Sequence, residues 1–89
     1  MFKVEWVASA LDDLTTIWLE ADANQRNAIT RATNDLERRL SSEPEEVGES
    51  RPDDRRIMFI ASLGVMLHID FVGRIVTVVG VWRFARRDP

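Results

Sequence analysis

The hydrophobic period of this 89-residue sequence changes twice, and the order of those changes constrains the fold more than any other feature. Residues 2–6 alternate apolar and polar side chains, the period-2 pattern of a half-buried strand. Residues 7–40 then carry apolar side chains at spacings of three and four, which is typical of amphipathic helices. Strand-like runs follow at 56–60, 65–71 and 75–82. The sequence therefore predicts the element order β-α-α-β-β-β.

The helical region divides at residues 22–24, a short polar connection that predicts an antiparallel hairpin of two helices. Ser9 followed by Asp12 resembles a capping box and indicates the start of the first helix. Asn24 is the expected cap of the second helix. The predicted core positions are Val7, Leu11, Leu14, Trp18 and Ala21 in the first helix and Ile29, Ala32, Leu36 and Leu40 in the second.

Residues 41–54 contain two prolines, a glycine and several acids without either periodicity, so we expect a loop there. Gly48 is expected to allow a turn with positive φ. Arg51 is expected to fix this loop by pairing with Glu45 or Glu46. A structural role is the simplest interpretation of the whole segment.

The three later runs predict strands that follow one another through tight turns. In the middle run, Val65, Leu67, Ile69 and Phe71 are expected to face the helices. The last run is so rich in Val and Ile that it should be a central strand covered on both faces, and the N-terminal strand should pair beside it. We therefore expect an α+β fold with the helical hairpin packed on one face of a four-stranded antiparallel sheet.

Composition places the chain among ordinary globular proteins, as one domain spanning residues 1–89. No apolar run approaches the roughly 20 residues that span a bilayer, and the N-terminus lacks the apolar core of a signal peptide. We expect no membrane association and a cytoplasmic location. The chain has no cysteine and a single histidine, His68, so neither a metal site nor a cofactor is expected.

Charge is distributed unevenly along the chain. Residues 1–50 carry five basic and eleven acidic side chains, a balance of −6, whereas residues 51–89 carry seven basic and four acidic, a balance of +3. One interpretation is a solvated surface on which the charges are unevenly distributed. The other is an acidic helical half behind a basic face that acts on the target. The sequence pI near 5.1 argues against strong nonspecific binding to nucleic acid.

Two short segments point to a known family. The segment Val47-Gly48-Glu49-Ser50-Arg51 and the ending Val81-Trp82-Arg83-Phe84-Ala85-Arg86-Arg87-Asp88-Pro89, in this element order, resemble the RelE/ParE superfamily of bacterial toxins. The resemblance covers nearly the whole chain. It implies a sheet with one face covered by a helical hairpin and the other free to act on a macromolecular target. It also implies the toxin of a type II toxin–antitoxin, or plasmid stabilisation, module held inactive by a cognate antitoxin.

The terminal Arg-Arg-Asp-Pro is similar to the tail of ParE-type members, which implies inhibition of a protein target of the DNA gyrase class by contact. Phe84-Ala85 stand where such tails commonly carry His-Gly. Aromatic and arginine side chains dominate binding energy at interfaces. The predicted target-binding residues are Arg56, Trp82, Arg83, Phe84, Arg86 and Arg87. The plain alternative is a frayed terminus whose arginines aid solubility.

A different function follows from the open strand face, where Met66, His68 and Asp70 are expected together, bordered by Arg55 or Arg56 and by Arg83. Imidazole suits proton transfer at neutral pH. His68 and Arg83 would be the catalytic residues of a metal-independent, ribosome-dependent mRNA endonuclease of the RelE type. Such members tend to carry Arg where Met66 stands and a Tyr or His near the C-terminus, and this chain has no tyrosine. A surface histidine is the alternative.

Three functions therefore remain: a ParE-like inhibitor, a RelE-like nuclease, and a non-toxic binding module on the same fold. The resemblance implies an antitoxin that wraps around the helices or the open sheet face. The outer face of the first helix, with Ile17 off the main stripe, and the apolar part of the tail are expected contacts. An unpaired strand edge is a further docking site. Alone, the chain is expected to form a weak homodimer.

Overall fold

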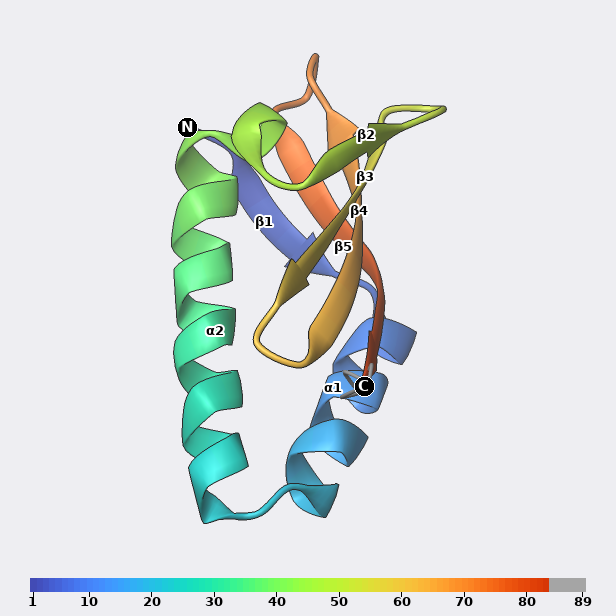
Figure 1. Cartoon of the computed structure of the whole chain (residues 1–89). Coiled ribbons are helices and arrows are strands. Elements are labelled where there is room, and N and C mark those ends of the chain that lie inside the picture. Colours follow the sequence, from blue (N-terminus) through green and yellow to red (C-terminus); the bar gives the residue numbers. More distant parts are fainter. Residues whose placement is uncertain (84–89) are drawn as a thin grey trace, which may run out of the picture.

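The computed structural model describes residues 1–83, in which two helices pack against a five-stranded sheet (Figure 1). The elements are β1 (Lys3–Trp6), α1 (Ala8–Glu20), α2 (Ala23–Ser42), the short 3-10 helix η1 (Pro44–Glu46), β2 (Glu49–Arg51), β3 (Arg55–Ile60), β4 (Leu63–Asp70) and β5 (Ile75–Arg83). The α+β class, the helical hairpin and the order of the six predicted elements are confirmed.

The strand order is β1-β5-β4-β3-β2, so the N-terminal strand lies beside the last one as predicted. β1 runs parallel to β5, whereas the other neighbours are antiparallel. The sheet is therefore mixed and not antiparallel throughout. Strands that are far apart in sequence can pair in parallel because the helices and the meander between them form the long connection that this pairing needs.

The segment 41–54 is not only a loop, because it contains η1 and the short edge strand β2. All three residues of β2 are exposed, so no apolar alternation marked it as a strand. Gly48 has a φ of 64°, as predicted, and a Cβ there would overlap the backbone of Ile57. Arg51 pairs with Glu49 at 3.3 Å and not with Glu45 or Glu46.

The helix starts differ from those expected. α1 begins after Val7, without a side-chain cap, and the Val7 amide donates to the Val78 carbonyl at 3.1 Å. The helix therefore starts directly from the sheet, and Ser9 does not cap it. α2 is capped by Asp22 instead of Asn24, in a full capping box with Gln25. The capping residue therefore lies two positions before the predicted one.

The predicted stripe on α2 is buried: Ile29, Ala32, Leu36 and Leu40 are each at most 8% exposed. The predicted stripe on α1 is confirmed only in part. Ala21 is buried and Val7 and Leu14 pack against the core, whereas Leu11 and Trp18 are 46% and 38% exposed. The buried Ala10 and Ile17 lie outside the predicted stripe. α1 carries apolar side chains on two adjoining faces, so periodicity alone did not decide which face packs against β5. Ile17 therefore belongs to the core and not to the outer surface.

The sheet buries one face. Its core positions are Met58, Leu63, Val65, Leu67, Ile69, Val76, Val78 and Val81. Phe71 is 51% exposed because β4 ends at Asp70 and Phe71 already lies in the turn to β5. β5 was expected to be covered on both faces, but Ile75, Thr77 and Val79 are only half-buried, so the face away from the helices is open. Figure 1 shows α1 near the end of β5 and α2 beside β1.

Candidate functional site

The open face of the sheet is the first candidate site. Side chains paired directly across neighbouring strands lie on the same face of a sheet. The register therefore arranges the open face in four rows. The first row is Trp82-Gly64-Phe59, the second is Gly80-Met66-Ile57-Glu49, the third is Glu5-Thr77-His68-Arg55-Arg51, and the fourth is Lys3-Ile75-Asp70. The register shifts between Met66 and Leu67, so Val79 is an extra residue on β5 without a direct partner on β4. On both sides of this bulge, paired residues of β4 and β5 face the same side of the sheet.

The first row holds an aromatic pair. Gly64 is buried under Trp82, and any Cβ at position 64 would overlap the indole ring. Phe59 meets Trp82 edge to face, with the ring centroids 6.3 Å apart. Phe59 is 60% exposed and Trp82 is 36% exposed. Trp82 was predicted as a binding residue, but Phe59 was not. Because residues 57–60 are apolar throughout, the sequence did not indicate which face of the sheet Phe59 lies on.

The third row holds the polar groups. His68 is half-buried and lies directly between Thr77 on β5 and Arg55 on β3. Arg55 is exposed and makes no ion pair with any residue of the described range 1–83. Arg51, at the end of the row, is already paired with Glu49. Of the two arginines considered for this border, the structure selects Arg55.

The other predicted arginines lie elsewhere. Arg56 points to the opposite face, where its Nε donates to the Val47 carbonyl at 2.6 Å and its Nη2 to the Gly48 carbonyl at 3.0 Å. It holds the loop before β2 in place. Arg83 pairs with Leu63, five residues along β4 from His68, which is roughly 16 Å at the rise of a strand. His68 and Arg83 are therefore not brought together. Phe84, Arg86 and Arg87 lie outside the described residues.

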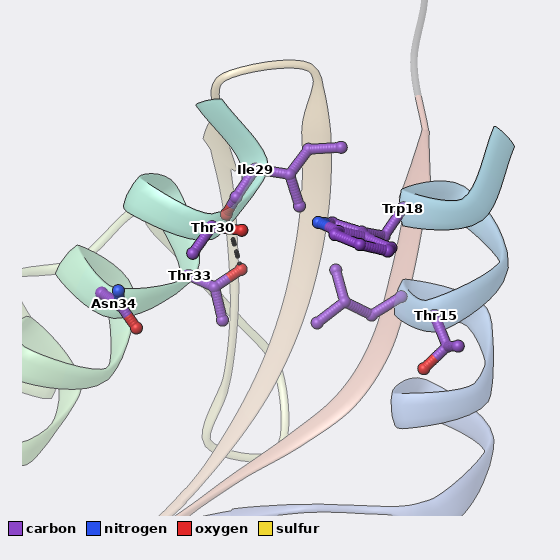
Figure 2. A pocket seen from close by; sticks show the side chains of 7 residues that line it. Thr15, Trp18, Ile29, Thr30, Thr33 and Asn34 are labelled. Carbon is purple, nitrogen blue, oxygen red and sulfur yellow. Dashed lines mark hydrogen bonds between the residues drawn. The ribbon is translucent and has the colours of Figure 1, made fainter. Parts of the chain in front are cut away.

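The second candidate site is a groove between the two helices (Figure 2). It has a volume of about 250 Å³ and is lined by Leu14, Thr15, Trp18, Ile29, Thr30, Thr33 and Asn34. Figure 2 shows Trp18 of α1 pointing across the groove toward Ile29 of α2. The lining contains no charged side chain. An apolar floor with a neutral polar rim suits the apolar face of a partner helix.

One arginine closes the end of this groove at the helix connection. The Arg26 guanidinium lies over the Trp18 ring, 4.5 Å from its centroid. Its Nε donates to the Trp18 carbonyl at 2.8 Å and its Nη2 to the Leu19 carbonyl at 2.7 Å. Arg26 thus adds side-chain hydrogen bonds to the last turn of α1, where the Trp18 carbonyl also accepts from the Ala21 amide at 3.2 Å. It also fixes the indole that forms one wall of the groove.

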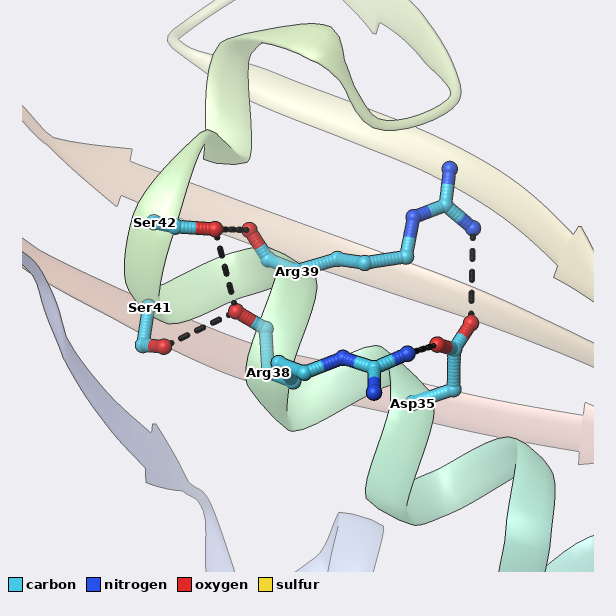
Figure 3. Close-up of polar contacts among 5 residues, drawn as sticks. All are labelled: Asp35, Arg38, Arg39, Ser41 and Ser42. Atoms are coloured by element: carbon cyan, nitrogen blue, oxygen red, sulfur yellow. Dashed lines mark hydrogen bonds and ion pairs between the residues drawn. The ribbon is translucent and has the colours of Figure 1, made fainter.

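The basic residues at the end of α2 are engaged locally (Figure 3). Asp35 forms ion pairs with Arg38 and with Arg39, the latter at 3.8 Å. The hydroxyls of Ser41 and Ser42 donate to the Arg38 carbonyl at 2.9 and 3.2 Å. These arginines balance the negative end of the helix dipole. The helical layer still exposes charged side chains outside the groove, among them Asp12, Asp13 and Glu37, so the absence of charge is confined to the groove lining.

Within residues 1–83 there is no cluster of three or more His, Asp or Glu side chains placed to hold a metal ion. The same range contains no helix that is both long and apolar enough to cross a bilayer.

Two helices on one face of a five-stranded mixed sheet, with the other face open, define the fold of the RelE/ParE toxins, and this chain has that fold. A chain of the chromosomal ParDE toxin–antitoxin system of P. aeruginosa matches with a TM-score of 0.72 and 13% identity, over 96% of this chain and 98% of the other. A chain of the RelBE2 toxin–antitoxin complex of Mycobacterium tuberculosis matches with a TM-score of 0.65 and 20% identity, over 93% and 98%.

The isolated E. coli RelE toxin matches with a TM-score of 0.65 and 14% identity, over 99% of this chain and 89% of the toxin. No family model matches the sequence, and no curated protein matches it significantly. At these identities the likeness concerns the fold, and both branches of the superfamily share it.

Proposed function

We propose that this chain is the toxin of a type II toxin–antitoxin module, ParE-like in acting on a protein target by contact and neutralised by a cognate antitoxin. One observation carries the proposal: each layer of the fold leaves its own apolar surface exposed, the groove between the helices and the aromatic row on the open sheet. Two such surfaces suit a toxin that binds its target with one and its inhibitor with the other. Similar solved structures from ParDE and RelBE modules support the assignment.

The groove between the helices is the proposed antitoxin site. Its lining is uncharged, and the exposed Leu11 and Leu19 extend the apolar surface of α1 beside it. An amphipathic helix can bury its apolar face in such a groove. The cognate antitoxin is therefore expected to contribute a helix whose apolar side contacts Trp18 and Ile29.

The target is proposed to be a protein, of the DNA gyrase class that the terminal Arg-Arg-Asp-Pro implies. The separation of about 16 Å between His68 and Arg83 supports this choice, because these were the two groups expected to cleave RNA. A target of this kind places the chain in the cytoplasm. A homodimer of the free chain stays a prediction.

A second candidate, a ribosome-dependent mRNA endonuclease, is favoured by one observation. Arg55 and His68 are direct cross-strand partners on the open face, with Thr77 on the other side of His68. In this reading His68 accepts the proton of a ribose 2′-hydroxyl, whose oxygen attacks phosphorus. The 5′-oxygen leaves with a proton from water, and a 2′,3′-cyclic phosphate results. Arg55 stabilises the charge that develops on phosphate.

Growth measurement and transcript 5′-end mapping after induction of the chain alone separate these functions. Growth arrest without new 5′ ends, together with loss of supercoiling by purified gyrase on adding the chain, is the expected result. New ends at fixed positions within translated codons would establish the nuclease instead. Unchanged growth with unchanged ends would contradict both toxin functions and favour a non-toxic binding module.

A further inference from the structure

We propose that the target-contacting surface is the aromatic patch of the open face, defined as Ile57, Phe59, Met66 and Trp82, together with the neighbouring Arg55. We infer that this patch takes a protein segment carrying an apolar or aromatic anchor and a carboxylate about 13 Å apart. The inference rests on the proposed function and identifies the surface that performs it.

The geometry of the aromatic pair is fixed before any partner arrives. Trp82 lies against Gly64, and the edge-to-face contact with Phe59 crosses from β5 over β4 to β3. Three hydrogen-bonded strands therefore hold the two rings. A rigid aromatic pair loses little conformational entropy on binding, and aromatic side chains are the commonest anchors of interfaces.

The apolar surface continues into the second row. Met66 and Ile57 are half-buried neighbours across β4 and β3, next to the aromatic row. Gly80, the partner of Met66 on β5, carries no side chain, and even a Cβ there would lie 3.8 Å from Met66. Gly80 therefore puts no side chain beside Met66, and a flexible Met can adapt its shape to an inserted side chain there.

Charge defines the other half of the recognition. On the open face Lys3 pairs with Glu5 at 3.4 Å, and Arg51 pairs with Glu49 at 3.3 Å. Arg55 has no such partner within residues 1–83 and therefore offers its guanidinium to a carboxylate. Arg55 precedes Phe59 by four residues on β3, which is about 13 Å along the strand. That distance sets the spacing expected in the partner.

A protein partner fits these observations better than a nucleic acid. Single strands are bound by a groove of cations along the phosphates together with stacked aromatics. Here the arginine beside the aromatic patch that lacks an ion pair among the described residues is Arg55, while Arg51 on the same face is already paired. Among the open-face residues of the described range, one available cation beside an apolar patch is the composition of a protein interface, where arginine and aromatic anchors occur together.

Two exposed substitutions test the patch. Phe59→Ser and Arg55→Glu should each reduce killing on induction by at least about tenfold, the loss expected when an interface anchor is removed. The matched controls are Phe71→Ser, an exposed aromatic in the β4–β5 turn, and Arg31→Glu, an exposed arginine on α2. Both controls should kill as the unchanged chain does. All four variants should fold and keep their affinity for the antitoxin. The Phe59→Ser and Phe71→Ser variants should lose a similar, small amount of Tm because each removes one edge-to-face contact, and Arg55→Lys should retain part of the activity.

Phe59→Ser and Arg55→Glu variants that fold and kill at the unchanged level would overturn the patch while leaving the proposed function standing. An unchanged chain that neither arrests growth nor binds an antitoxin would overturn the proposed function, and the patch with it. A photo-crosslinking benzophenone at position 59 distinguishes the target class, with position 71 as control. We expect an adduct at position 59 but not at position 71. Proteases should remove this adduct, and ribonuclease should not. A ribonuclease-sensitive adduct would assign this face to RNA.

Discussion

The groove between the helices and the aromatic patch on the sheet both present an exposed tryptophan, but the two indoles lie in different surroundings. Trp18 is held by the Arg26 guanidinium and faces an uncharged lining. Trp82 is held by Gly64 and Phe59, and Arg55 offers a positive charge two rows away. Under the proposals above, the groove would select an apolar helix face by shape, whereas the patch would select an anchor and a carboxylate.

The two surfaces also differ in how they are supported. The patch lies on three strands joined by continuous backbone pairing, so its side chains keep their relative positions. The groove lies between two helices whose connection Arg26 fixes at one end. A groove of that kind changes width when one helix tilts, whereas the sheet does not. The proposed function therefore pairs the target with the surface held by the sheet and the antitoxin with the surface between the helices.

The largest effect on folding and killing together is expected from Gly64→Val. The new side chain would occupy the position of the Trp82 indole, so the aromatic row must open. We expect a stability loss of about 1–3 kcal/mol, the usual range for overpacking, and loss of killing. Thermal unfolding and a growth assay measure both. The double variant Gly64→Val with Trp82→Ala should recover stability but not killing. A double variant that kills normally would show that the patch does not bind the target.

Trp18→Ala should act on the other surface alone. It removes the indole wall of the groove, so antitoxin affinity should fall by about 2–4 kcal/mol, as for a buried interface anchor. Titration calorimetry against the antitoxin measures this loss. Killing by the free chain should not change. A variant that binds the antitoxin normally would place the inhibitor elsewhere on the surface.

Arg26→Ala tests the support of the groove. It removes the contact with the Trp18 ring and two bonds to the carbonyls at the end of α1. These bonds are exposed, so we expect a stability loss of only about 1 kcal/mol. The antitoxin should dissociate faster, as surface plasmon resonance would show. Arg26→Lys keeps the charge without the planar fork and should restore only part of the lost affinity. An unchanged dissociation rate would separate Arg26 from antitoxin binding.

The smallest effect is expected from Asp35→Asn, which weakens the ion pairs with Arg38 and Arg39. Exposed pairs of this kind contribute about 0–1 kcal/mol. Chemical denaturation should show a change within that range, and both binding surfaces should keep their affinities. A large loss of target or antitoxin binding would mean that the end of α2 belongs to one of them.

The sequence predicted those parts of the fold that periodicity determines. The stripe on α2 and the alternation of Val65, Leu67 and Ile69 were confirmed because each has one apolar face. The stripe on α1 was only partly correct, with Leu11 and Trp18 exposed, because that helix has two adjoining apolar faces. β2 was missed because all of its residues are exposed and polar.

The candidate site was predicted less completely, because a site depends on register. Strand alternation placed His68 on the open face, but only the pairing with β3 shows that Arg55 lies opposite it and that Arg56 points to the other side. Phe59 and Gly64 form a unit with Trp82 only across three strands. Nothing in the order of residues along the chain indicates that contact.

One growth measurement tests directly whether target and antitoxin use separate surfaces. The Trp18→Ala and Phe59→Ser variants would each be induced with and without the cognate antitoxin. The two-surface account predicts that Trp18→Ala arrests growth even when the antitoxin is present, whereas Phe59→Ser is harmless without it. If Trp18→Ala is fully neutralised and Phe59→Ser alone remains lethal, the assignment of both surfaces is contradicted.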